Sequence, residues 1–198
     1  MKQLSDTPQW GSFALVSYLP DPLGSFLHGL RQLLPGEDNP QPHITILPPR
    51  PLKLPVDAAS HQAQKVLFRF PAFEVVLSKV RHFPGTNILF LDIAKGNAPI
   101  YDLHEALSAG DLYHPEPFAF RPHLTLSGPV PTADLKTLCW NTEMAWRTSE
   151  CPARFILDEV VCLWLPPDSS QGEWQRLWSH HLTSKQASAA RAAAAVTS

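Results

Sequence analysis

Hydrophobic residues in the first half of the chain follow strand and helix patterns in turn. Apolar runs rich in β-branched and aromatic residues, or alternating with polar residues, predict strands. Apolar residues that recur every three or four positions after a capping residue predict helices. The predicted elements are a strand over residues 12–19, a helix over residues 23–34 capped by Asp21, a strand over residues 42–47 closed by Pro48-Pro49, a helix capped by Asp57, and a strand over residues 73–80.

The same order of elements begins again about 80 residues later. The second set is a strand over residues 87–93, a helix capped by Asn97 and closed by Gly110, a strand over residues 122–126, a helix capped by Thr132, and a strand over residues 155–165. The two sets match element for element. They predict a duplicated β-α-β-α-β unit, with repeat 1 over residues 10–83 and repeat 2 over residues 86–183.

The end of the chain adds one more strand pattern over residues 173–182, which can complete a sheet. Residues 184–198 are rich in alanine, and we expect them to form a flexible tail despite their helix propensity. Residues 1–183 are therefore predicted to form a single domain built from the two repeats.

Composition supports a folded protein and limits its partners. Hydrophobic residues make up 44% of the 198 residues and charged residues only 17%, so the chain can bury a sizeable core. The formal net charge is −2. A protein that holds long nucleic acid mainly through phosphate contacts needs a surplus of Lys and Arg. Any phosphate ligand is therefore expected to be small or to be bound locally.

The cysteines and the hydropathy pattern bear on location. Cys139, Cys151 and Cys162 are an odd number without CxxC spacing, so neither a disulfide framework nor a zinc site is predicted. No segment resembles a signal peptide, and none approaches the roughly 18 apolar residues of a membrane span. We expect a cytoplasmic protein with no membrane association and no obligate protein partner.

A five-residue motif occurs once in each repeat. Pro42-His43-Ile44-Thr45-Ile46 and Pro122-His123-Leu124-Thr125-Leu126 occupy equivalent predicted strands. Because strand side chains alternate, each histidine shares one face with its threonine, and the aliphatic residues lie on the other face. A third match, His181-Leu182-Thr183, lacks the preceding proline and has no repeat-equivalent position, so we attribute it to chance. His43 and His123 are thus predicted to act as a pair.

These motifs, together with the opening strand Phe13-Ala-Leu-Val-Ser-Tyr-Leu-Pro20, resemble the two-histidine phosphoesterase superfamily. That superfamily includes bacterial and archaeal 2′-5′ RNA ligases and 2′,3′-cyclic nucleotide phosphodiesterases. The resemblance implies an α+β fold of two pseudo-symmetric lobes of antiparallel sheet, with helices packed outside and a central cleft. One histidine motif from each lobe would face the other across that cleft.

The resemblance also implies a phosphodiesterase that processes RNA ends without a metal or another cofactor. Displacement at phosphorus is roughly in line, so one histidine of the pair, His43 or His123, would act as base and the other as acid. Thr45 and Thr125 would donate hydrogen bonds to the phosphate. Arg121 and Arg50 are weaker candidates for phosphate contacts. The expected ligand is a small nucleotide or an RNA terminus that carries a cyclic phosphate.

Alternative functions remain open at this point. The same chemistry run backwards would join RNA ends through a 2′-5′ linkage. A non-catalytic protein that binds nucleotides or RNA ends would keep the cleft without turnover. A metal-dependent hydrolase fits less well, because two His-x-Thr pairs offer only two strong ligands. A nucleotide site also calls for a stacking aromatic residue, for which the candidates are Phe90, Phe118, Phe120 and Trp164, with core packing as the default role of each.

Overall fold

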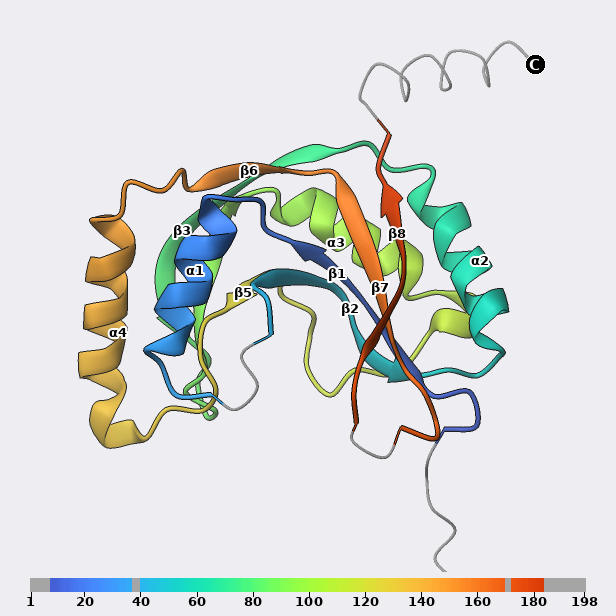
Figure 1. The fold of residues 1–198 in the computed structure, drawn as a ribbon, viewed down its shortest axis with the longest axis horizontal. Coiled ribbons are helices and arrows are strands. Elements are labelled where there is room, and N and C mark those ends of the chain that lie inside the picture. The colour runs from blue at the N-terminus through green and yellow to red at the C-terminus, as the bar shows by residue number, and fades with distance from the viewer. Residues whose placement is uncertain (1–7, 37–39, 170–171, 184–198) are drawn as a thin grey trace, which may run out of the picture.

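One antiparallel sheet of eight strands runs through the molecule, with four α-helices packed beside it (Figure 1). The computed structural model describes residues 8–36, 40–169 and 172–183. The strands are β1 (Ser12–Tyr18), β2 (His43–Pro51), β3 (Phe73–His82), β4 (Leu89–Lys95), β5 (Leu124–Thr125), β6 (Arg154–Leu157), β7 (Glu159–Leu165) and β8 (Gln175–His181). The helices are α1 (Leu23–Gln32), α2 (Val56–Leu67), α3 (Asn97–Leu107) and α4 (Thr132–Arg147), with a short 3₁₀ turn η1 (Gly110–Leu112).

The order of strands across the sheet, β6-β3-β4-β5-β2-β1-β7-β8, is symmetric about the β5–β2 pair. Each repeat supplies its first two strands to one side of this centre, β1 and β2 on one side and β4 and β5 on the other. The third strand of each repeat crosses over, because β3 pairs with β4 and β7 pairs with β1. The predicted α+β fold with two pseudo-symmetric halves is confirmed, and each half contains strands from both repeats.

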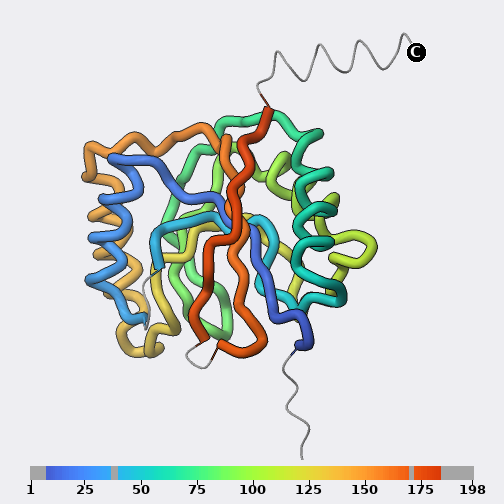
Figure 2. Tube along the Cα trace, turned by 45° about the vertical axis from the view of Figure 1, so that its right-hand side comes forward, coloured from blue at the N-terminus to red at the C-terminus, as the bar shows by residue number. Residues whose placement is uncertain are grey.

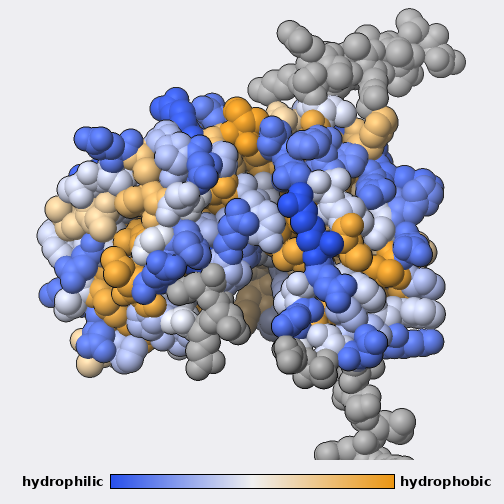
Figure 3. Space-filling view, in the orientation of Figure 1, coloured by the Kyte–Doolittle hydropathy of each residue, from blue (hydrophilic) through white to orange (hydrophobic). Residues whose placement is uncertain are grey.

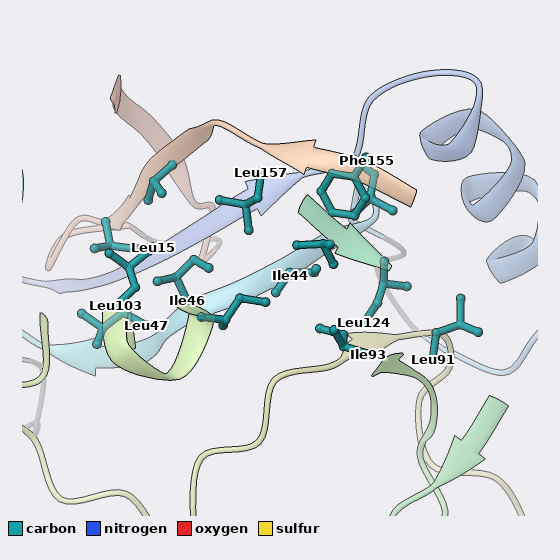
Figure 4. Close-up of a cluster of buried hydrophobic side chains, with 14 of the residues drawn as sticks. Leu15, Ile44, Ile46, Leu47, Leu91, Ile93, Leu103, Leu124, Phe155 and Leu157 are labelled. Atoms are coloured by element: carbon teal, nitrogen blue, oxygen red, sulfur yellow. The ribbon is translucent and has the colours of Figure 1, made fainter. Parts of the chain in front are cut away.

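Helices α1 and α4 lie together over one end of the sheet, and α2 and α3 lie over the other end (Figures 1 and 2). Apolar side chains fill the space between sheet and helices (Figure 4). Ile44 and Leu124, the central residues of the two motifs, are both fully buried in this core. The face seen in Figure 3 has a recess near its middle with hydrophilic side chains on its rims. The core therefore anchors the two motifs at the centre of the sheet.

The two motif strands differ in length from the prediction. The prediction ended the first strand at Leu47, but β2 continues to Pro51 because its outer residues still pair with β1. Pro48 and Pro49 are tolerated within β2 because only Ile44 pairs with β5 and because the pairing with β1 has a register shift at these two residues. The second strand was predicted over residues 122–126, but the sheet includes only Leu124–Thr125.

The predicted strand over residues 155–165 is divided at Asp158. Its first part, β6, pairs with β3, and its second part, β7, pairs with β1 and β8. A single straight strand could not reach both sides of the sheet, so the chain changes partner at this residue.

The predicted helix caps are one or two residues from the observed ones, which are Pro22, Pro55, Gly96 and Pro131. Asp21 still accepts hydrogen bonds from the backbone N–H and the hydroxyl of Ser25, so it satisfies a donor in the first turn of α1. Gly96 has φ +100°, and a Cβ there would lie 3.0 Å from the carbonyl oxygen of Glu74. Glycine is therefore required at the start of α3.

Two further expectations concern the whole chain. The predicted flexible tail over residues 184–198 lies outside the described residues. The single domain over residues 1–183 also includes undescribed residues, and it stays a prediction. Within the described part of the chain, no helix has the length and apolar character needed to cross a membrane.

Candidate active site

The pairing of β2 with β5 brings the two motifs together at the centre of the sheet. Ile44 and Leu124 are direct partners in this antiparallel pair. Continuing the register by one residue in each direction sets His43 opposite Thr125 and Thr45 opposite His123. Because side chains alternate along a strand, these four lie on the face opposite the buried Ile44 and Leu124.

The backbone around the two motifs has the same pattern of exposure. Over residues 41–50 and 121–130, buried, partly buried and exposed positions follow in the same order, and both histidines and both threonines are partly buried. The duplication therefore extends from the order of elements to the environment of individual positions.

Each histidine is oriented by a backbone carbonyl two residues before it. His43 Nδ1 donates to the carbonyl oxygen of Gln41 at 2.8 Å, and His123 Nδ1 donates to that of Arg121 at 2.7 Å. A carbonyl oxygen only accepts, so Nδ1 carries a proton in both rings. Nε2 then accepts a proton when the ring is neutral and donates one when it is charged. Both rings therefore keep Nε2 for a ligand.

Aromatic rings enclose the two imidazoles on their apolar sides. Tyr18, the strand partner of His43, meets it edge-on with ring centroids 6.1 Å apart. His123 has similar edge contacts with Phe83 at 4.9 Å and Phe90 at 5.5 Å. These contacts limit rotation of the rings and reduce their access to water.

Burial is the largest influence on the pKa of His43 and lowers it from the ordinary value of about 6.5. The hydrogen bond to the Gln41 carbonyl opposes this shift. The positive charges of Arg31 and of protonated His123 lower the pKa of His43 further. The surroundings of His43 therefore favour its neutral form.

Burial also lowers the pKa of His123, again as the largest influence, and the hydrogen bond to the Arg121 carbonyl opposes it. The Arg121 guanidinium lowers the pKa of His123, whereas the Asp92 carboxylate raises it. His123 thus has a nearby negative charge that favours its protonated form.

Asp92 occupies a position in β4 that corresponds to Tyr18 in β1. Leu91 pairs with Leu124, so the next residue of β4, Asp92, is set opposite His123 by the register. Its carboxylate forms ion pairs with Arg81 at 2.9 Å and with Arg121 at 3.1 Å. Three charged side chains therefore lie beside the second histidine.

Comparison with known protein families identifies the chain. The model of the 2′-5′ RNA ligase superfamily matches residues 19–168, which is well over half of the sequence and includes both motifs. The chain belongs to the 2′-5′ RNA ligase superfamily. Among curated proteins, no sequence matches this member of the superfamily.

Several solved structures share this fold at low sequence identity. TT0787 of Thermus thermophilus is 15% identical with a TM-score of 0.62, and the match covers 88% of this chain and 99% of that one. E. coli LigT in complex with 3′-AMP is 15% identical with a TM-score of 0.60, over 88% and 99% of the two chains. Kluyveromyces marxianus Usb1 with uridine monophosphate is 9% identical with a TM-score of 0.53, over 86% and 98%.

The candidate residues named from sequence fall into two groups in this superfamily member. His43, His123, Thr45 and Thr125 come together on one face of the sheet. The side chain of Arg121 lies near them, with its guanidinium 4.9 Å from the ring centroid of Phe90 and ion-paired to Asp92.

Arg50 belongs to the interior instead. Its side chain is 1% exposed and forms an ion pair with Glu116 at 2.5 Å. It also donates to the carbonyl oxygens of Pro48 and Leu112 and to the Ser108 hydroxyl. These contacts tie β2 to the segment that leads into the second motif, and we do not propose Arg50 as a phosphate ligand.

Sequence reasoning missed Tyr18, Asp92 and Arg81. A repeat alignment extended to the first strand of each unit could have paired Tyr18 with Asp92, because each is the next-to-last residue of its predicted strand. Arg81 had no local signal, since only the pairing of β3 with β4 brings it to Asp92.

The third His-x-Thr match lies apart from the paired motifs. His181, in the third His-x-Thr match, is the last residue of the edge strand β8, and its side chain is 77% exposed. Over the described ranges, no cluster of three or more His, Cys, Asp or Glu side chains that could hold a metal ion was found.

Proposed function

We propose that this protein is a metal-independent phosphoesterase that acts on an RNA-type phosphodiester, most directly a 2′,3′-cyclic phosphate. One observation carries the proposal. His43 begins β2 and His123 directly precedes β5, its antiparallel neighbour, and each ring has Nδ1 held by a carbonyl and Nε2 left for a ligand. Two such imidazoles can serve the two ends of one in-line displacement.

The proposed reaction begins with water attacking phosphorus. The water oxygen forms a bond to phosphorus while the bond from phosphorus to one ribose oxygen breaks. Nε2 of the neutral histidine takes the water proton, and Nε2 of the protonated histidine gives its proton to the departing ribose oxygen. The product is a nucleoside monophosphate with a free neighbouring hydroxyl.

The surrounding charges support a division of roles between the rings. The charges of Arg31 and of protonated His123 both lower the pKa of His43, whereas His123 has Arg121, which lowers its pKa, and Asp92, which raises it. On this ground we assign His43 as the base and His123, the ring with a carboxylate beside it, as the acid. Each proton transfer of this kind contributes about 10²–10⁴ in rate.

The threonines and Arg121 would contact the phosphate itself. Thr45 and Thr125 lie opposite the two histidines in the strand register, where their hydroxyls can donate to the non-bridging oxygens as negative charge grows. Arg121 would add a positive charge at the edge of this site.

The relatives support a nucleotide ligand. Solved structures of this fold are complexes of LigT with 3′-AMP and of Usb1 with uridine monophosphate. The formal net charge of −2 in this chain favours a small nucleotide or an RNA terminus over a long nucleic acid.

Hydrolysis of the four 2′,3′-cyclic mononucleotides in the presence of a chelator tests the proposal. We expect turnover to a 2′- or 3′-monophosphate that is lost in His43→Ala and His123→Ala and kept in His181→Ala. Protection of the protein against heating by a cyclic nucleotide without any turnover would instead indicate a binding protein. Activity that needs added metal would contradict the mechanism.

A further inference from the structure

His104 lies in the interior between the segments that carry the two motifs, and the proposed reaction does not use it. It belongs to the buried face of α3 with Ile100, Leu103 and Leu107, and it is only 3% exposed. An aliphatic side chain would complete this apolar face, whereas a buried imidazole needs partners for its polar atoms. The partners of His104 therefore indicate what a histidine does at this position.

One partner lies in the strand of the first motif. His104 Nδ1 donates to the carbonyl oxygen of Ile46 at 2.9 Å. Ile46 directly follows Thr45 and is the extra residue of a β-bulge, because β1 pairs with Thr45 and then with Leu47. A bulge leaves its extra residue outside the ladder and bends the strand. His104 thus holds β2 at the point where its ladder to β1 is interrupted.

The other partners lie in the segment that leads to the second motif. The Phe120 ring stacks on the His104 ring, with centroids 3.7 Å apart and planes 3° from parallel. His104 Nε2 lies 3.5 Å from Glu116 Oε1. Residues 113–123, all of which the structure describes, belong to no helix or strand. Because this irregular segment ends at His123, the contacts of its side chains help to place that ring.

The sheet joins the two motifs through a single residue pair. Ile44 pairs with Leu124, and β5 is only two residues long. The contacts of His104 add a second connection, three residues after His43 and three residues before His123. Displacement of a catalytic group by about 1 Å can lower a rate by about 10²-fold, so an in-line displacement depends on the spacing of the two rings.

We propose that His104 is a positioning residue that sets the spacing between His43 and His123. Its hydrogen bond to Ile46 holds the first motif, and its ring stack with Phe120 holds the second. This inference rests on the proposed function, to which it adds a residue that acts through the two histidines.

Two substitutions separate the two contacts. His104→Asn keeps an N–H donor for the Ile46 carbonyl and removes the stacked ring. His104→Phe keeps a ring for Phe120 and removes the donor. With a 2′,3′-cyclic mononucleotide as substrate, each variant should lower kcat by about tenfold and change KM by less than about twofold, because the altered group orients the catalytic rings and does not bind the ligand.

Imidazole NMR spectra of the ligand-free protein give a readout that does not depend on turnover. His104→Asn should change the ring resonances of His123 and leave those of His43 nearly unchanged, and His104→Phe should do the opposite. Leu107→Ala is the control, because Leu107 is fully buried on the same face of α3. It should lower the unfolding temperature and leave kcat and both histidine spectra unchanged.

The outcomes separate the inference from the proposed function. Wild-type turnover with kcat and both histidine spectra unchanged in the His104 variants would overturn the positioning role and leave the phosphoesterase intact. A loss of kcat without the expected spectral changes, or no larger than that of Leu107→Ala, would overturn the positioning role too. The expected spectral changes in a protein whose wild type shows no turnover would retain the geometric role of His104 and overturn the proposed function. If His104→Asn fails to fold, Phe120→Leu removes the same stack and should give the same change at His123.

Discussion

Tyr18 is the strand partner of His43, whereas Asp92 occupies the corresponding position beside His123. Both histidines have the same backbone partner two residues earlier, the same alternation of burial and a matched threonine. Their charged neighbours are different, with Arg31 near His43 and the group formed by Asp92, Arg81 and Arg121 near His123.

The comparison shows which features of the site come from the duplicated backbone and which come from individual side chains. The repeated strands place two imidazoles in equivalent geometry, because pairing and register act on the backbone. A general acid and a general base need unequal proton affinities, however, and symmetry alone cannot provide them. In this chain the charged neighbours of the two rings differ, and they are the proposed source of that inequality.

The largest expected effect is loss of catalysis when either histidine is removed. His43→Ala and His123→Ala should each lower turnover by about 10² or more, since each removes one proton transfer. His43→Asn and His123→Asn should lose as much activity while keeping a donor for the carbonyl two residues before. Steady-state rates and thermal unfolding of these variants check this. Near-normal turnover in either Ala variant would remove that residue from its role.

The next largest effect is expected on stability, when the Arg50–Glu116 ion pair is broken. Glu116→Gln leaves a buried guanidinium without its counter-charge, which should lower the free energy of unfolding by about 3 kcal/mol. Lys95→Gln breaks the exposed pair with Glu74 and serves as the control, with an expected loss below about 1 kcal/mol. Urea unfolding of both variants measures the two losses in free energy of unfolding. Equal losses would show that the Arg50–Glu116 pair stabilises the fold no more than an exposed ion pair does.

Local sequence patterns predicted the motifs, the repeat and the order of elements, because alternation and helical spacing act over a few residues. They could not predict that β3 and β7 cross to the other half, since strand pairing is long-range. The same limit explains Arg50, which lies shortly after the first motif but reaches Glu116 only because β2 continues past Pro48 and Pro49. Tyr18 and Asp92 likewise become neighbours of the histidines only through strand register.

A smaller loss of kcat/KM is expected when either threonine is replaced. The two losses should be equal if the two motifs are placed symmetrically about the phosphate. Thr45→Val and Thr125→Val each remove a hydroxyl donor without changing shape, and each should lower kcat/KM by about tenfold. Measurement of both variants on one cyclic nucleotide is sufficient. Losses that differ by more than tenfold would show that the phosphate sits closer to one motif than to the other.

The smallest expected effect is a shift in proton affinity at one histidine. Asp92→Asn removes the charge that raises the pKa of His123, so that pKa should fall while the pKa of His43 stays nearly unchanged. Tyr18→Phe is the matched control in the other half, because burial raises the pKa of Tyr18 and keeps it neutral. NMR titration of the imidazole protons reports both values. An unchanged His123 pKa in Asp92→Asn would remove the proposed cause of the difference between the halves.

The pH dependence of kcat/KM for a 2′,3′-cyclic nucleotide, measured with a chelator present, tests the two-histidine mechanism most directly. The base must be neutral and the acid protonated, and the surroundings lower the pKa of both rings. We therefore predict a bell-shaped profile whose maximum lies below the ordinary histidine pKa of about 6.5. A rate that does not change between about pH 5 and 8, or that disappears when the chelator is added, would contradict the mechanism.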